Sequence, residues 1–154
     1  MVLAKPRYVE NAVCVSISSP KDIVNLDNTI KDMIEICRLH NGVGLAAPQV
    51  GIRQRFFIAF SSDKEWKLFI NPRYVPIGNE KYNTIEGCLT YGPEPHYLVQ
   101  RYEKVQAIWQ EIQNRILVDK TKVLEGVFAQ IFQHETDHCD GVTTAMIGKL
   151  VKSD

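Results

Sequence analysis

The stretch Gln133–His138, which reads QHETDH, decides how the rest of the chain is interpreted. His134 and His138 are four residues apart, so on a helix both imidazoles project from the same face, one turn apart. Two imidazoles at that separation can share one metal ion, and Glu135 between them can reach a metal-bound water as a general base. The pattern therefore predicts a helix that carries a metal site.

The predicted helix extends from about Leu124 to Asp140, and Gly141 follows at the position where a glycine ends many helices. Val127 and Ile131 precede the motif at helical spacing, which indicates that the histidines lie beside apolar side chains. A fully solvated helix face is therefore disfavoured.

A catalytic site of this type needs a third protein ligand and an open coordination position. Residues 139–154 contain neither His nor Glu, so the third ligand is expected upstream. Cys88 is favoured, because Gly87 before it lets another backbone or a peptide come close. The other upstream candidates are Cys14, Cys37, His40 and His96.

The region from about Arg55 to Val118 is predicted to form strands, since it contains short runs rich in aromatic and β-branched residues. No helix-sized connection separates these runs, which favours antiparallel pairing. The clearest strands are expected at Arg55–Phe60, Trp66–Asn71, Tyr97–Gln100 and through the alternating residues Lys104–Gln110.

An earlier helix is predicted by Ser19-Pro20 as a start signal and Asn41-Gly42 as a stop signal, with apolar residues from Ile23 to Cys37 at steps of three and four. The following stretch, Gly42–Gly51, is too rich in Gly and Pro for a regular helix and too apolar for a solvated loop. The order helix, strands, helix predicts an α+β fold, with mostly antiparallel sheets packed around a central helix that carries the metal motif. No linker or repeat interrupts the sequence, so residues 1–154 are expected to form a single catalytic domain.

Composition excludes several classes of protein. The chain has 154 residues, 45% of them hydrophobic and 23% charged, which is typical of a globular domain and not of a disordered chain. Its formal net charge is zero, which argues against DNA binding. It contains no apolar stretch long enough to cross a bilayer and no secretory signal, and its four cysteines lack the spacing of a disulfide scaffold.

Three stretches together resemble the signature motifs of the peptide deformylase family: GVGLAAPQ at 42–49, EGCLT at 86–90 and QHETDH at 133–138. Their order and approximate spacing also match, and the resemblance extends from the first helix to Gly141. It implies metal-dependent hydrolysis of the N-formyl group from the N-terminal formyl-methionine of polypeptides, with release of formate.

The resemblance also implies a role for individual residues. Glu135 would move protons between water and the leaving amine, and the Gly44 backbone would orient the formamide N–H. Arg101 would pair with Asp137. The implied metal ligands are Cys88, His134 and His138; the oxyanion donors are the Gln49 amide and the Leu89 N–H; Gly42, Gly44 and Gly87 would border the bound peptide; and Val43, Val127, Ile131 and His134 would line the pocket for methionine.

Cofactor and partners follow from the same resemblance. It implies one divalent metal ion, Fe²⁺ as the working metal, with Zn²⁺, Ni²⁺ or Co²⁺ in purified protein. The expected partners are N-formylmethionyl peptides of nascent chains, at the ribosome, bound by a monomer. The expected location is the cytoplasm of a bacterium or of a virus-infected host cell, with an organelle as the alternative.

The chain departs from the usual family pattern at several positions. Thr90 stands where serine is common, His96 where arginine is common and Cys139 where leucine is usual. The loop Tyr91–Pro93 is one residue longer, and no long helix is expected after Val142.

Two other functions are compatible with the helical metal motif. A peptide-cleaving metalloprotease is disfavoured by the upstream cysteine and the lack of a downstream ligand. A non-catalytic formyl-peptide-binding relative is disfavoured because every catalytic position is occupied.

Overall fold

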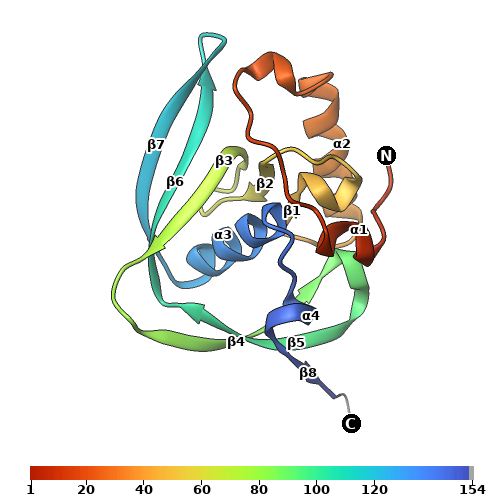
Figure 1. The fold of residues 1–154 in the computed structure, drawn as a ribbon, viewed down its shortest axis with the longest axis vertical. Coiled ribbons are helices and arrows are strands. Elements are labelled where there is room, and N and C mark those ends of the chain that lie inside the picture. The colour runs from red at the N-terminus through yellow and green to blue at the C-terminus, as the bar shows by residue number, and fades with distance from the viewer. Residues whose placement is uncertain (153–154) are drawn as a thin grey trace.

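The computed structural model describes residues 1–152 (Figure 1). Helices and single helical turns open the chain, strands make up most of its middle, and the last long helix follows the last long strand. In chain order the elements are α1 (Pro6–Glu10), η1 (Pro20–Asp22), α2 (Leu26–Leu39), β1 (Gly44–Ala46), η2 (Ala47–Val50), β2 (Phe56–Phe60), β3 (Trp66–Pro76), β4 (Lys81–Cys88), η3 (Leu89–Tyr91), β5 (Gly92–Tyr102), β6 (Lys104–Gln113), β7 (Ile116–Glu125), α3 (Gly126–Cys139), α4 (Thr144–Ile147) and β8 (Lys149–Val151).

The strands form two sheets. One has five strands in the order β1-β2-β3-β6-β7, and the other has three strands in the order β4-β5-β8. Within the described residues, every pair of named strands is antiparallel, which confirms the predicted α+β class with antiparallel sheets. The helix α3, which carries the QHETDH motif, contacts strands of both sheets (Figure 1).

The larger core is aromatic and lies where α3 meets the five-stranded sheet. Phe132 of α3 packs edge-to-face on Phe57 and Phe69, whose rings stack with centroids 4.8 Å apart. Such edge-to-face pairs contribute about 0.5–1.5 kcal/mol beyond the burial of their area. This contact fixes α3 against β2 and β3, and with it the face that carries the histidines.

The smaller core lies under α2. Met33 and Cys37 of that helix are fully buried and pack with Leu45 of β1 and with Phe56 and Ile58 of β2. The predicted amphipathic helix is therefore present, and its apolar stripe covers the β1–β2 edge of the larger sheet.

The start of the first long helix was predicted wrongly. Ser19 caps only the single turn η1, where the Asp22 carboxylate accepts hydrogen bonds from the Ser18 and Ser19 N–H groups. The chain then passes through Asn25 in the left-handed region, with φ 49°, and α2 begins at Leu26. The local capping chemistry is satisfied within one turn, so it does not mark the long helix.

The start of α3 was also placed too early. Leu124 and Glu125 still belong to β7, because they pair with Val105 and Lys104 of β6. The hairpin continues this ladder to its end, and Gly126, with φ 68°, then turns the chain into the helix. The predicted end is confirmed, since α3 stops at Cys139 and Gly141 has φ 74°.

The remaining segments agree with the sequence or refine it. Asn71-Pro72 marks a bulge within β3, where the register shifts between Ile70 and Arg73, and does not end the strand. After Val142 the described chain contains only the short α4 and β8, as expected. Across residues 1–152, none of the helices has the length and apolar character required to cross a bilayer.

Candidate metal centre and active site

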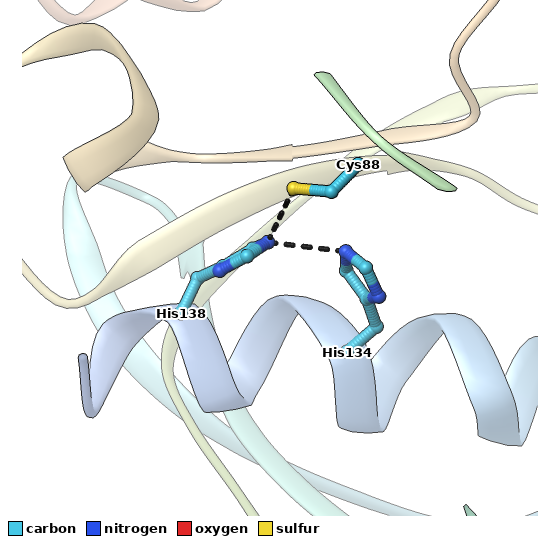
Figure 2. A group of neighbouring side chains, drawn as sticks. All are labelled: Cys88, His134 and His138. Carbon is cyan, nitrogen blue, oxygen red and sulfur yellow. Dashed lines mark hydrogen bonds between the residues drawn. The ribbon is translucent and has the colours of Figure 1, made fainter. Parts of the chain in front are cut away.

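Cys88 closes β4, and His134 and His138 project from adjacent turns of α3 toward it (Figure 2). His138 Nε2 lies 3.1 Å from His134 Nε2 and 3.4 Å from Cys88 Sγ. The potential ligand atoms of the three residues all lie within 4.8 Å of one another. Of the five upstream candidates for a third ligand, Cys88 is the one that the structure brings to the two histidines within residues 1–152.

The hydrogen bonds of His134 show that this group fits a metal ion. Its Nδ1–H donates to Glu86 Oε1 at 2.8 Å, so its Nε2 presents a lone pair toward His138. A carboxylate behind a histidine is the arrangement that usually orients a metal-ligating imidazole. One thiolate and two imidazole nitrogens suit zinc, iron, nickel or cobalt, so the residues present fit a divalent transition metal.

The electrostatics agree with a cation site. Burial raises the pKa of the Cys88 thiol, but His138 and His134 beside it outweigh burial and hold that pKa well below its usual value. Burial lowers the pKa of His134, yet hydrogen bonds to Cys88 and Glu86 reverse the shift and raise it to about 10. Both shifts stabilise the Cys88 thiolate, which is the form that ligates a metal, and a bound cation would take the place of the His134 proton in balancing its charge.

A buried ion-pair network holds His134 from behind. Arg101 of β5 donates Nη2–H to Glu86 Oε1 at 2.7 Å and Nε–H to Glu86 Oε2 at 2.9 Å, and it donates Nη1–H to Asp137 at 2.7 Å. The side chains of Arg101 and Glu86 are each 3% exposed. Tyr74 of β3 also donates to Asp137, at 2.8 Å, so strands of both sheets position α3.

Glu135 lies on the cavity side of α3 and is only 4% exposed. Within the described residues its Oε1 is buried without a hydrogen-bond partner, and burial raises the pKa of this carboxyl. A Cβ added at Gly44 would lie 2.6 Å from Glu135 Oε2, so β1 approaches the carboxylate as closely as a glycine permits. An unpaired buried oxygen of this kind is available to a substrate or a water.

Gln49 is held in one orientation on the turn η2. Its Oε1 accepts a hydrogen bond from the Ala46 N–H at 2.9 Å, and its Nε2 donates to Thr90 Oγ1 at 3.0 Å. The same Nε2 lies 3.4 Å from Cys88 Sγ. The amide N–H groups therefore face the ligand group, and the carbonyl faces away from it.

These groups open into a cavity of about 330 Å³. Val43, Ile131 and His134 line it, together with the predicted backbone contacts. Val127 does not line it, contrary to the expectation: this residue is in the first turn of α3, one turn before Ile131, and is 71% exposed. The full lining is His40, Asn41, Gly42, Val43, Gly44, Gln49, Ile85, Glu86, Gly87, Cys88, Leu89, Gly92, Pro93, His96, Gln130, Ile131, His134 and Glu135.

Sequence reasoning missed two contacts that support the site. The Glu86 carboxylate, which holds His134, was noted only as part of the EGCLT motif. Tyr91, in the longer loop after that motif, donates to Glu10 of α1 at 2.6 Å. The acidic residue Glu86, two positions before the candidate ligand Cys88, could have indicated a carboxylate behind the site. Glu10, the partner of Tyr91, is remote in sequence, so no local pattern indicates that contact.

Fold and site together define a metal-binding hydrolase: two imidazoles and a thiolate come together, and a buried, unpaired carboxylate lines the same cavity as Cys88 and His134. The family described as polypeptide deformylase matches residues 6–152. A peptide deformylase of Thermotoga petrophila is 41% identical over 118 residues, which cover 77% of this chain and 69% of that protein.

Solved structures agree. The crystal structure of the Thermotoga maritima peptide deformylase superposes with a TM-score of 0.79 at 34% identity, and the alignment covers 96% of this chain and 95% of that one. A Plasmodium falciparum peptide deformylase gives 0.83 at 26% identity, over 97% and 86% of the two chains.

The chain belongs to the polypeptide deformylase family. It is a hydrolase that removes the N-formyl group from polypeptides.

Proposed function

We propose that the chain deformylates an N-terminal formyl-methionine by means of one divalent metal ion held by Cys88, His134 and His138, with Glu135 as the proton-transfer group. The observation that carries this proposal is the unpaired Glu135 Oε1 in the cavity that Cys88 and His134 also line, with His138 completing the ligand group. When bound, the ion supplies Lewis-acid polarisation and brings the pKa of a bound water to about 7.

Glu135 takes a proton from the attacking water and delivers it to the leaving amine. Its burial favours this role, since a carboxylate with a raised pKa is a stronger base and a better proton donor after it is protonated. The Gly44 backbone lies against Glu135, and this backbone orients the formamide N–H of the substrate.

Gln49 and Leu89 stabilise the oxygen that becomes negative in the attack. The Gln49 Nε2–H groups face the three metal ligands. Leu89 directly follows the ligand Cys88 and begins the turn η3, so its backbone N–H lies next to the metal site in the chain. One such donor is commonly worth about 2.7–4 kcal/mol.

The methionine side chain occupies the cavity lined by Val43, Ile131 and the apolar part of His134. The backbone at Gly87 and Gly44 borders an extended peptide, which binds through main-chain hydrogen bonds like an added strand. This binding mode recognises the peptide backbone and not its side chains, so the substrate residues after the methionine can vary.

The working metal is Fe²⁺, and Zn²⁺, Ni²⁺ or Co²⁺ can replace it in purified protein. The substrates are nascent chains at the ribosome, and the whole chain acts as one monomeric catalytic domain. It works in the cytoplasm of a bacterium or of a virus-infected cell, or in an organelle.

The first experiment measures formate release from matched formyl-Met and formyl-Asp peptides. Formyl-Met is expected to be much faster, and equal rates would contradict the pocket. Cleavage of an internal peptide bond would instead indicate a protease, and binding without formate release would indicate a non-catalytic relative.

Glu135→Gln is expected to retain the metal and to lose 10²–10⁴-fold in rate, since the carboxylate is not a ligand. Metal content is the control measurement for this variant. Near wild-type turnover would exclude the proposed role of Glu135.

The metal is tested by stripping the protein and reconstituting it anaerobically with each ion. The ferrous form is expected to release formate fastest at saturating substrate. A zinc form of equal or higher activity would exclude iron as the preferred metal and would leave the ligand set intact.

A further inference from the structure

Two thiols outside the metal site come together from opposite ends of the chain. The segment after α1 lies against the end of α3, where the Cys14 N–H donates to the Cys139 carbonyl at 3.1 Å. The fit is close: a Cβ added at Gly141 would lie 3.2 Å from the carbonyl oxygens of Ala12 and Glu10. A backbone hydrogen bond between two residues brings their Cα atoms into the range that a disulfide spans.

The two thiols differ in the way that thiol–disulfide exchange requires. Cys139 is fully buried, whereas Cys14 is partly exposed, and both are free. The neighbouring Cys139 side chain and the Arg55 guanidinium lower the pKa of Cys14, although burial opposes them. Thiolate character and exposure together make Cys14 the more reactive of the pair.

We infer that Cys14 and Cys139 are a modification site, a dithiol that low-molecular-weight disulfides such as oxidised glutathione convert to an intramolecular disulfide. The Cys14 thiolate attacks one sulfur of oxidised glutathione, whose S–S bond breaks and releases one glutathione thiolate. The released glutathione thiolate takes the proton of the Cys139 thiol, and the Cys139 sulfur attacks the Cys14 sulfur and displaces the second glutathione as a thiolate. Two protein thiols are oxidised, and one glutathione disulfide is reduced to two glutathione molecules.

The position of this disulfide links it to the metal site. Cys139 directly follows the ligand His138 on α3. The Cys14 segment continues from α1, where Glu10 accepts the hydrogen bond from Tyr91, three residues after Cys88. The cross-link therefore ties to α3 a short segment that already contacts η3, the turn directly after the ligand Cys88, and it closes a loop of more than 100 residues. A long loop gives a large restriction of the unfolded chain.

The test uses the metal-loaded protein, in which Cys88 is bound to the metal and is therefore protected from oxidation. This protein is equilibrated in glutathione buffers of increasing oxidised fraction. After the remaining thiols are blocked, peptide mass mapping should find one disulfide, between Cys14 and Cys139. The oxidised protein should melt roughly 5–15 °C above the reduced protein and should lose its metal to a chelator more slowly.

Two variants separate the steps. Cys14→Ser should form neither the disulfide nor a glutathione adduct at this site. Cys139→Ala should stop at a glutathione adduct on Cys14, and both variants should deformylate at the wild-type rate in reducing buffer. A disulfide between other cysteines, the absence of any disulfide, or an oxidised form that melts no higher than the reduced form would overturn the inference. Mass and melting temperature need no turnover, so these outcomes are independent of the proposed catalytic mechanism.

Discussion

The two sides of α3 pack against the two sheets by different means. Toward the five-stranded sheet, Phe132 meets the rings of Phe57 and Phe69. Toward the three-stranded sheet, Asp137 meets Arg101, which also holds Glu86 behind a candidate metal ligand. Apolar contact is non-directional and supplies stability, whereas charged hydrogen bonds are directional and set the orientation of the ligands. One face of the helix therefore supplies mainly apolar contact and the other mainly charged hydrogen bonds, to which Tyr74 of the five-stranded sheet also contributes.

The largest combined effect, on stability and on metal affinity, is expected from Arg101→Met, on the polar side. Removing the guanidinium leaves the buried carboxylate of Glu86 and the partly buried carboxylate of Asp137 without their main partner, and breaking a buried pair in this way costs about 3–5 kcal/mol. Unfolding in urea measures the stability, and metal affinity should fall as well because His134 loses its support.

The matched control for this variant is Lys104→Met. Lys104 pairs with Glu125 at 3.4 Å on the exposed hairpin, so the loss should stay below about 1 kcal/mol. If the two variants lost equal stability, the buried network would have no special role.

Phe132→Ala on the apolar side is expected to cost about 3–5 kcal/mol in the free energy of unfolding, because it leaves a cavity between three aromatic rings. In contrast to the Arg101 variant, the folded protein should bind its metal nearly as tightly as wild type. A titration with metal at a temperature where both proteins are folded checks this. A large loss of metal affinity would show that the two sides of α3 are not separable.

A smaller effect is expected from Tyr74→Phe, which removes one hydrogen bond to Asp137 while Arg101 still holds that carboxylate. Hydrogen bonds to charged groups contribute about 1.5–3 kcal/mol. Tyr82→Phe is the control, since Tyr82 donates to the Gly126 carbonyl at 3.1 Å on the surface and should cost about 0.5–1.5 kcal/mol or less. Thermal unfolding compares the two, and a larger loss at Tyr82 would contradict the assignment.

The smallest effect is expected at the C-terminus. Deleting Lys152–Asp154 removes residues beyond β8, and formate release should stay within about twofold of wild type, since tolerance concentrates at termini outside the core. Residues 153 and 154 lie outside the described part of the chain.

Deleting Lys149–Asp154 instead removes β8, whose Val151 pairs with His96 of β5, so this longer deletion should lower both stability and activity. If the short deletion abolished activity, the tail would have to support the site directly.

Much of the site was predictable from the sequence because its spacing is local. His134 and His138 share a helix face by the period of the helix, and Cys88 was favoured by the glycine before it. The fold class followed from strand runs without helix-sized connections. The boundaries were less predictable: Leu124 has the pattern of a helix residue, but pairing with Val105 across the hairpin keeps it in a strand.

The amino-acid sequence by itself determined the chemistry of this protein: the residue types at the metal site, the helix that carries two of them and the family to which the chain belongs. Only the tertiary structure decided which partners hold those residues. Glu86 behind His134, Asp137 between Arg101 and Tyr74, and Cys14 beside Cys139 are contacts between segments remote in the chain. Helical and strand periods carry no information about such contacts, because they arise from how the sheets and α3 pack together.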